Sequence, residues 1–299
     1  MASNVLYPKG QKLSYALATR TKGKTVAALQ TDTAITIDGE RLTATLDEDW
    51  NIWGPNGGYV ASVALRAAGA LAPEGHRPAS ISVQYLSVAE FDAVECQVTP
   101  VKKGRNAWLL NVALIQKDRT FLQAQVWTTN KADGPQVLEA AMPSVPGPEG
   151  LKTMDEHRGA DPASRKGFWI NLDTKPVVFR PYGEANPAGA RSADWYRFER
   201  YENAARDFFL DAARSLVLID TLIWPVHARA YDGQRPYIAP SLDVMVWFHQ
   251  PALEADWLLM ETATDVAVGG LIHGRSRIWT ADRKLIATGG SNLLHVPQK

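Results

Sequence analysis

Hydrophobic and polar residues follow the same order of patterns in each half of the chain. The first half begins with the alternation of a β-strand at residues 34–46 and continues with apolar positions at helical spacing over residues 57–71. Four more strand-like runs, rich in β-branched and aromatic residues, follow at 80–86, 93–102, 108–116 and 120–129. The second half has strand-like runs at 175–182 and 194–201, a helical pattern at 206–224, and further strand-like runs at 241–249, 257–264, 271–280 and 284–294.

The repeat is also visible in the residues themselves. The segment SVQYLSV stands 163 positions before MVWFHQP, and KDRTFLQAQ stands 164 positions before ADRKLIATG. A duplicated unit of strand, long helix and four-stranded meander accounts for both observations. We therefore predict an α+β fold in which two antiparallel sheets each wrap a long central helix and join edge to edge. Residues 143–167 carry four prolines and four glycines with little periodicity, which predicts a linker.

Composition narrows the class of protein. The 299 residues include 32 basic and 32 acidic side chains, and this balance argues against nucleic acid as the main partner. No run approaches the roughly 18 apolar residues of a membrane span, and residues 1–20 lack the apolar core of a secretory signal. Cys96 is the only cysteine, so no internal disulfide is expected, and its alternation with valines predicts a buried strand thiol. We expect a cytoplasmic protein.

Several well-known motifs are incomplete in this chain. The segment Thr21–Thr25 resembles the end of a phosphate-binding P-loop, but Ala18 stands where the first glycine belongs. The segment GGSNL resembles the turn around a nucleophilic serine, but Leu293 replaces the second glycine. The six histidines are scattered without metal-ligand spacing, and no GxGxxG opens a helix. We therefore expect neither a metal nor a cofactor.

One carboxylate is predicted to lie on an apolar helix face. In SLVLIDTLIWPVHAR, Asp220 has Leu216 and Val217 one turn before it, and Ile223 and Trp224 one turn after it. Burial raises the pKa of a carboxyl group, and groups with such a raised pKa are candidates for general bases. A buried aspartate that ties the helix to a neighbouring strand explains the position equally well, so both interpretations stay open.

The turn before the first helix raises a related question. Pro55 and Asn56 lead into Gly57 and Gly58, two poor helix formers at the start of a helix. Either the glycines relieve crowding, or they let a substrate carbonyl approach backbone N–H groups whose effect the helix dipole reinforces. If the halves pack as a pseudo-twofold pair, this turn and Asp220 face each other across a cleft. That arrangement suits the transfer of an acyl group to water.

Taken together, these segments resemble the acyl-CoA thioesterase II and thioesterase-like proteins, which have a double hotdog fold. The resemblance covers roughly residues 27–298 and rests on WGPNGGYVASVALRAA, LVLIDTLIWPV, PSLDVMVWFHQP and GRSRIWTADRKLIAT, in that order. It implies an N-terminal hotdog at 1–142 and a C-terminal hotdog at 168–299, on either side of the linker. It also implies hydrolysis of an acyl-CoA or related acyl thioester without a cofactor.

The water-activating group of that family is an Asp on the second helix, a Thr or Ser on the following strand and a Gln on the last strand. Asp220 matches the first and Ser241 the second, whereas the Gln position falls on Ser291, which is too short to replace a Gln amide. The adjacent Asn292 is expected to point to the opposite face of the strand. Asp243 is interpreted as structural.

The resemblance leaves substrate recognition and the reaction class partly open. Trp53 and Trp224 are expected to line the cleft with Asn56, Gly57 and Gly58. The basic hairpin residues, namely Lys102, Lys103 and Arg105, either meet CoA phosphates or form a solvated turn. The missing Gln favours one alternative, a non-catalytic acyl-thioester binder or pathway accessory protein. A hotdog enzyme with another acyl substrate is a further alternative, but the neighbouring Asp and His of a hotdog hydratase or dehydratase are not seen. Because two fused halves supply the usual hotdog pair, a homo-oligomer is possible but optional.

Overall fold

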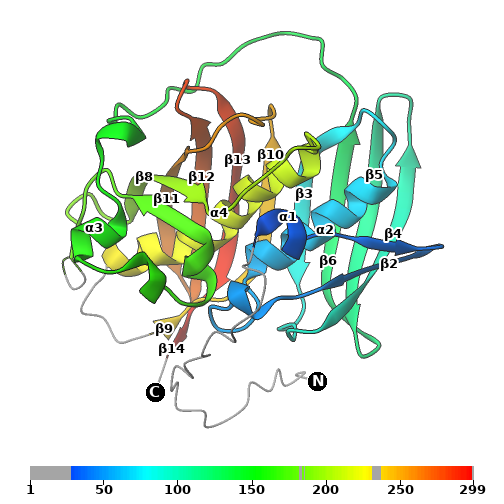
Figure 1. Ribbon diagram of the computed structural model, residues 1–299, viewed down its shortest axis with the longest axis horizontal. Helices are drawn as coiled ribbons and strands as arrows, with labels where there is room; N and C mark the ends of the chain where they lie inside the picture. Colours follow the sequence, from blue (N-terminus) through cyan, green and yellow to red (C-terminus); the bar gives the residue numbers. More distant parts are fainter. Residues whose placement is uncertain (1–27, 182–183, 185, 231–236, 298–299) are drawn as a thin grey trace.

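A single antiparallel sheet runs through the whole molecule. A computed structural model describes residues 28–181, 184, 186–230 and 237–297. Residues 1–20 and the segment Thr21–Thr25 lie outside the described residues. Twelve strands follow the order β1-β2-β4-β5-β6-β3-β10-β13-β12-β11-β8-β7, so that each half of the sheet belongs to one half of the chain (Figure 1).

The bounds of the elements follow the repeat. The first half contains α1 (Leu29–Asp32), β1 (Thr36–Asp38), β2 (Arg41–Thr45), α2 (Gly57–Leu71), β3 (Arg77–Tyr85), β4 (Ala93–Lys103), β5 (Ala107–Gln116) and β6 (Arg119–Thr129). The linker contains α3 (Met154–Arg158). The second half contains β7 (Leu172–Lys175), β8 (Arg191–Phe198), α4 (Phe208–Ala230), β10 (Ser241–Phe248), β11 (Leu258–Val268), β12 (Leu271–Thr280) and β13 (Leu285–Leu294). A small ribbon pairs β9 (Tyr237–Ile238) with β14 (Val296–Pro297).

The two halves join through strands β3 and β10, and the register of this seam reproduces the repeat. Ser82 pairs with Met245, its own counterpart at the 163-residue spacing. Ile81 pairs with Val246 and Val83 with Val244, so equivalent residues exchange contacts on either side of the centre. This is the pattern of a twofold interface between identical subunits. The two sheets predicted to join edge to edge are therefore a pseudo-dimer within one chain.

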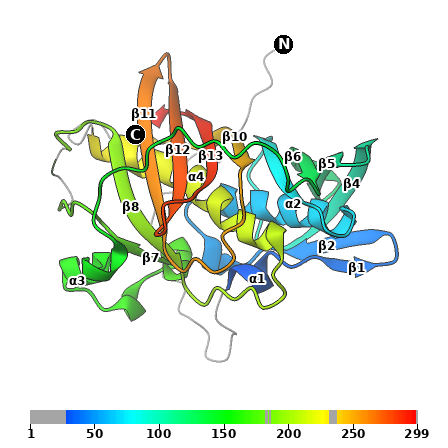
Figure 2. The same cartoon turned by 90° about the horizontal axis from the view of Figure 1, so that it is seen from above.

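Both long helices lie on the same side of the sheet and pack against each other (Figures 1 and 2). Helix α2 starts at the Asn56 cap, whose side chain accepts from the Tyr59 N–H, and most of its residues are buried. Helix α4 is buried along most of its length between α2 and the second half of the sheet. In the described part of the chain, no helix combines the length and apolar character that crossing a membrane requires.

Most predicted elements are present, with three differences. Residues 34–46 form the hairpin β1–β2 rather than one strand, because Gly39 turns the chain with a positive φ of 59°. The predicted strand at 175–182 is wrong, since β7 ends at Lys175, directly before a proline that has no N–H for the ladder. Helix α4 continues through Pro225 to Ala230, because the buried face formed by residues such as Val226 and His227 extends beyond the proline. Cys96 is buried on β4, as predicted.

The linker covers the outer face of the second half of the sheet, opposite α4. Figure 2 shows it crossing that half toward α3. Its apolar side chains pack on a buried group of outward-facing strand residues formed by Trp195, Leu259, Trp279 and Leu285. The residues that take part are Val145 and Leu151 of the linker and, directly before it, Ala140 and Met142. The Trp195 indole N–H also donates to the Pro146 carbonyl over 2.9 Å. The linker is thus part of the packed structure.

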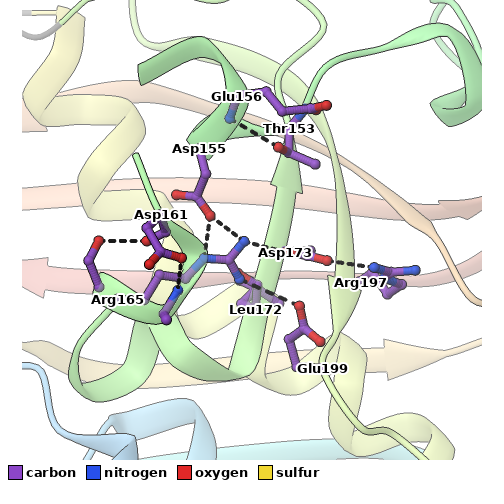
Figure 3. A network of polar contacts seen from close by, with 11 residues as sticks. Thr153, Asp155, Glu156, Asp161, Arg165, Leu172, Asp173, Arg197 and Glu199 are labelled. Atoms are coloured by element: carbon purple, nitrogen blue, oxygen red, sulfur yellow. Dashed lines mark hydrogen bonds and ion pairs between the residues drawn. The ribbon is translucent and has the colours of Figure 1, made fainter. Parts of the chain in front are cut away.

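A buried cation fastens the end of the linker to β7 and β8. The Arg165 guanidinium lies 2.5 Å from both Asp155 on α3 and Asp173 on β7, and it also approaches Glu199 (Figure 3). Arg197 on β8 completes the network with a 2.6 Å contact to Asp173. Because Asp155 and Asp173 are largely buried, these cations take the place of the water that would otherwise solvate their carboxylates.

We predict that Arg165→Met destabilises the protein by about 3 kcal/mol, since it leaves buried carboxylates without their main cation. Urea unfolding measures the loss, and limited proteolysis within residues 143–167 reports release of the linker. The matched control is Arg191→Met, which removes an exposed ion pair with Asp265 and should change stability little. Equal effects of the two variants would contradict a stabilising role of the Arg165 network.

Candidate active site

Asp220 lies at the middle of α4, where the two halves meet. Its side chain is 5% exposed and accepts a 3.1 Å hydrogen bond at Oδ1 from the Tyr85 hydroxyl on β3. Burial raises its pKa from 3.8 to about 6, although hydrogen bonds from Ser241, Tyr85 and the Gly58 N–H act in the opposite direction. A carboxylate with a pKa near neutrality is suited to take a proton from water.

The start of α2 crosses α4 at very short range, and this explains its glycines. A β-carbon on Gly58 would lie 2.7 Å from the Cα of Val217 and 2.9 Å from its carbonyl oxygen. A β-carbon on Gly57 would lie 2.7 Å from Asp220 Oδ2. Both positions therefore require glycine for the helices to approach. The glycines therefore relieve crowding, which is one of the two interpretations of the turn. At Gly57 the crowding group is the Asp220 carboxylate.

The Asn56 side chain forms hydrogen bonds with both helices at this crossing. Its Oδ1 accepts from the Tyr59 N–H over 2.9 Å, and its Nδ2 donates to Thr221 Oγ1 over 2.9 Å. The same side chain thus caps α2 and holds it against α4, next to Asp220. The structure therefore gives Asn56 two intramolecular partners, both inside a buried contact.

One main-chain N–H group at the start of α2 donates to the Asp220 carboxylate. The Gly58 N–H stabilises ionised Asp220, and the positive end of the α2 dipole acts in the same direction. The Gly57 N–H has no hydrogen-bond acceptor among the residues that the structure describes. The Gly58 N–H is therefore bonded to Asp220, and the Gly57 N–H is available to a ligand.

A bulge in β10 turns Ser241 toward Asp220. Ser241 pairs with Leu293 and Asp243 with Asn292, so Leu242 is an extra residue on β10. Directly paired residues share a face of the sheet, and Leu293 is buried on the helix side. Ser241 therefore faces the helices, where its hydroxyl acts on the Asp220 carboxylate. Without the bulge, strict alternation would place it on the outer face with Asp243.

Ser291 lies on the helix side of β13 but its hydroxyl is used elsewhere. It pairs with Val244, is 1% exposed, and donates a 2.5 Å hydrogen bond to the Asp243 carbonyl oxygen. Asn292 faces away, as expected, and both its main-chain and side-chain N–H groups donate to the Asp243 carboxylate. These contacts agree with the structural role expected for Asp243.

Two tryptophans from the two halves meet one helical turn from Asp220. The rings of Trp53 and Trp224 make an edge-to-face contact with centroids 4.9 Å apart. Trp53 is 39% exposed, while the Trp224 indole nitrogen is buried without a hydrogen-bond partner among the described residues. The pair is therefore an aromatic contact between the two halves, close to the Asp220 carboxylate along α4.

The basic hairpin between β4 and β5 lies on another part of the first half. Lys102 is placed over the Trp127 ring at 5.6 Å, and Lys103 over the Trp108 ring at 5.1 Å. These cation–π contacts are intramolecular. The structure does not bring this hairpin to Asp220 through any described contact.

Tyr85 is the site residue that the sequence did not single out. It follows Ile81 and Val83 in the alternation of β3, which predicts that it faces the core. The alternation within SVQYLSV therefore indicated a core position for Tyr85. The hydrogen bond of its hydroxyl depends on where α4 crosses the sheet. Only the three-dimensional arrangement shows the hydroxyl beside a carboxylate.

Comparison with known families and structures shows to which family the chain belongs. The family model described as the acyl-CoA thioesterase N-terminal domain matches residues 46–129, and the model of the C-terminal domain matches residues 148–290. The chain belongs to the acyl-CoA thioesterase family. The activity that names this family is the hydrolysis of thioesters, in agreement with the resemblance found in the sequence.

Individual proteins agree with this assignment. Human acyl-coenzyme A thioesterase 8 is 24% identical over 268 residues, which cover 81% of this chain and 83% of that protein. A hot dog fold protein of unknown function from Alicyclobacillus acidocaldarius superimposes with a TM-score of 0.73 at 19% identity, covering 91% and 98% of the two chains. For the acyl-CoA thioesterase II TesB2 from Mycobacterium marinum the TM-score is 0.72 at 16% identity, covering 91% and 99%. The predicted double hotdog fold is confirmed.

The two glycines of the turn give a paired prediction. In Gly58→Ala the new methyl group meets the Val217 backbone, so the helices must separate and stability should fall by about 1–3 kcal/mol. In Gly57→Ala it meets the end of the Asp220 side chain, so the fold should be largely kept while thioester hydrolysis falls at least about tenfold. Thermal unfolding and an assay of thiol release separate the two effects. Full activity in folded Gly57→Ala would contradict the close contact with Asp220.

Proposed function

We propose that the protein hydrolyses an acyl-CoA thioester, or a related acyl thioester, with a water molecule activated by Asp220. One observation carries the proposal. A buried carboxylate, with a pKa raised by burial to about 6, lies between a hydroxyl on β10 and the start of α2. Membership of the acyl-CoA thioesterase family supports this choice of chemistry.

The proposed reaction needs one base and one oxyanion donor. Asp220 takes a proton from water as the water oxygen attacks the thioester carbonyl carbon. The carbonyl oxygen becomes negative and is stabilised by the Gly57 N–H and the positive end of the α2 dipole. The intermediate then breaks its C–S bond, and the proton held by Asp220 passes to the sulfur. The products are a carboxylic acid and a free thiol, and Asp220 is again ionised.

Ser241 is proposed to hold the attacking water. Its hydroxyl faces the helices because of the bulge at Leu242, and it lies close enough to Asp220 to act on its ionisation. A hydroxyl can accept from water while it donates to a carboxylate. Trp53 and Trp224 are proposed to flank the substrate at the surface end of this arrangement.

A non-catalytic acyl-thioester binder remains a second candidate, favoured by one observation. The Ser291 hydroxyl donates to the Asp243 carbonyl oxygen instead of approaching the water site that the family resemblance places beside residue 291. A protein with this function would keep substrate binding and lose turnover.

We predict that Asp220→Asn lowers kcat/KM for acyl-CoA hydrolysis by about 10² or more, since an amide cannot accept the proton. In the wild type, kcat/KM should fall below about pH 6 as Asp220 becomes protonated. Thiol release from a panel of acyl-CoA substrates measures both effects. Tight binding of acyl-CoA without turnover by the wild type would favour the binder.

The same substitution tests the raised pKa through stability. The folded state binds a proton at Asp220 more tightly than the unfolded state, whose carboxyl pKa is 3.8. The wild type therefore loses stability as the pH rises from 3.8 to about 6, by about 1.4 kcal/mol per pKa unit, or nearly 3 kcal/mol in total. The amide that replaces the carboxyl group carries no charge, so the free energy of unfolding should shift in favour of Asp220→Asn between pH 4 and pH 7. A difference between variant and wild type that does not change with pH would contradict the raised pKa.

A further inference from the structure

We infer that Tyr85 is a positioning residue for Asp220 and supplies, from the first half of the chain, a polar contact to this carboxylate that Ser291 does not make. The inference rests on the proposed function, in which Asp220 takes the proton from water. Its direct basis is the 3.1 Å hydrogen bond that the Tyr85 hydroxyl donates to Asp220 Oδ1.

The two carboxylate oxygens of Asp220 have different surroundings. Oδ1 accepts from Tyr85, whereas Oδ2 lies at the start of α2, within 2.7 Å of where a β-carbon on Gly57 would be. The Tyr85 ring borders the same place, since its Cζ lies 3.3 Å from that β-carbon position. With Oδ1 held by Tyr85, Oδ2 is the oxygen that remains at the start of α2. Oδ2 is therefore the oxygen that takes the proton.

The seam between the halves provides an internal comparison. Its register pairs Ser82 with Met245, its counterpart in the repeat, so that Tyr85 corresponds to Phe248. Both rings lie on the core side of their strands, and Phe248 is 8% exposed. Phe248 shows that a ring without a hydroxyl packs at this position in the second half. The hydroxyl is present in the copy that contacts Asp220.

Tyr85 acts as a hydrogen-bond donor and not as an acid or base. Burial, and then the nearby charge of Asp220, hold the pKa of Tyr85 well above its ordinary value, so the phenol keeps its proton throughout the reaction. Its hydrogen bond favours the ionised form of Asp220 and opposes the effect of burial. Tyr85 thereby serves two purposes: it orients the carboxylate, and it keeps a buried base ionised near neutral pH.

Ser291 is already committed to another contact. A serine hydroxyl has one proton to donate, and at Ser291 this proton goes to the Asp243 carbonyl oxygen, 2.5 Å away on the neighbouring strand. The side chain is 1% exposed and held between β10 and β12. A polar contact to Asp220 comes instead from β3 of the first half.

The test is Tyr85→Phe, which removes the hydroxyl and keeps the ring, as Phe248 does in the second half. We expect the acid limb of the kcat/KM profile to move up by about one pH unit, because the ionised form of Asp220 loses a donor. Activity at pH 6 should then fall about fivefold, and activity at pH 9 should fall less. A purely structural role of Tyr85 predicts no movement of the acid limb.

The matched control is Tyr59→Phe on the first turn of α2. Tyr59 is buried, and its hydroxyl contacts the main chain, donating to the Asp32 carbonyl and accepting from the Asp47 N–H. Its loss should lower the free energy of unfolding and leave the acid limb in place. A similar movement of the limb in both variants would overturn the specific role of Tyr85.

A titration that does not depend on turnover separates this inference from the proposed function. The carboxyl ¹³C signal of Asp220 in labelled protein, assigned by its disappearance in Asp220→Asn, reports ionisation directly. A higher midpoint in Tyr85→Phe, with none in Tyr59→Phe, supports the positioning role even if no acyl-CoA is hydrolysed. An unchanged midpoint in Tyr85→Phe overturns it, whatever the activity of the wild type.

Discussion

The close crossing of α2 and α4 is the constraint on which the rest of the structure depends. The first turn of α2 has room for hydrogen but not for a β-carbon, because the Val217 backbone and the Asp220 carboxylate occupy that space. Asn56 fixes the contact by capping one helix and bonding to the other. Since each helix is held by its own half of the sheet, this crossing also sets how the two halves meet. The site is a consequence of that contact.

Asp220 is a buried carboxylate that the structure holds without a cation beside it. Burial opposes its ionisation, and the groups that donate hydrogen bonds to it are neutral: two hydroxyl groups and one main-chain N–H. Neutral donors reduce the cost of charge without cancelling it, so the pKa stays near 6. The Arg165 network shows the opposite solution, in which cations lie directly against buried carboxylates. A carboxylate neutralised in that way would be a poor base.

The sequence predicted the fold more completely than the site. The 163-residue spacing between SVQYLSV and MVWFHQP is also the spacing of Ser82 and Met245, the pair at the centre of the seam. The repeat in the sequence therefore predicted how the two halves are related. Asp220 was recognisable because apolar neighbours surround it on its helix face. The direction of Ser241 was not, because it depends on one extra residue in β10. Local patterns also did not reveal Tyr85 as a donor, since an alternating aromatic residue on a strand is typical of a core position.

The pseudo-dimer explains why such a site can be assembled from unlike parts. In a dimer of identical chains, a substitution at one seam position appears at both symmetry-related places. In this chain Tyr85 and Phe248 occupy equivalent places, so one half can carry a hydroxyl while the other keeps a plain ring. In the proposed reaction, the base and its serine come from the second half, and the tyrosine and the α2 N–H groups come from the first. A fused repeat thus permits each half to specialise while the shared seam preserves the packing of both.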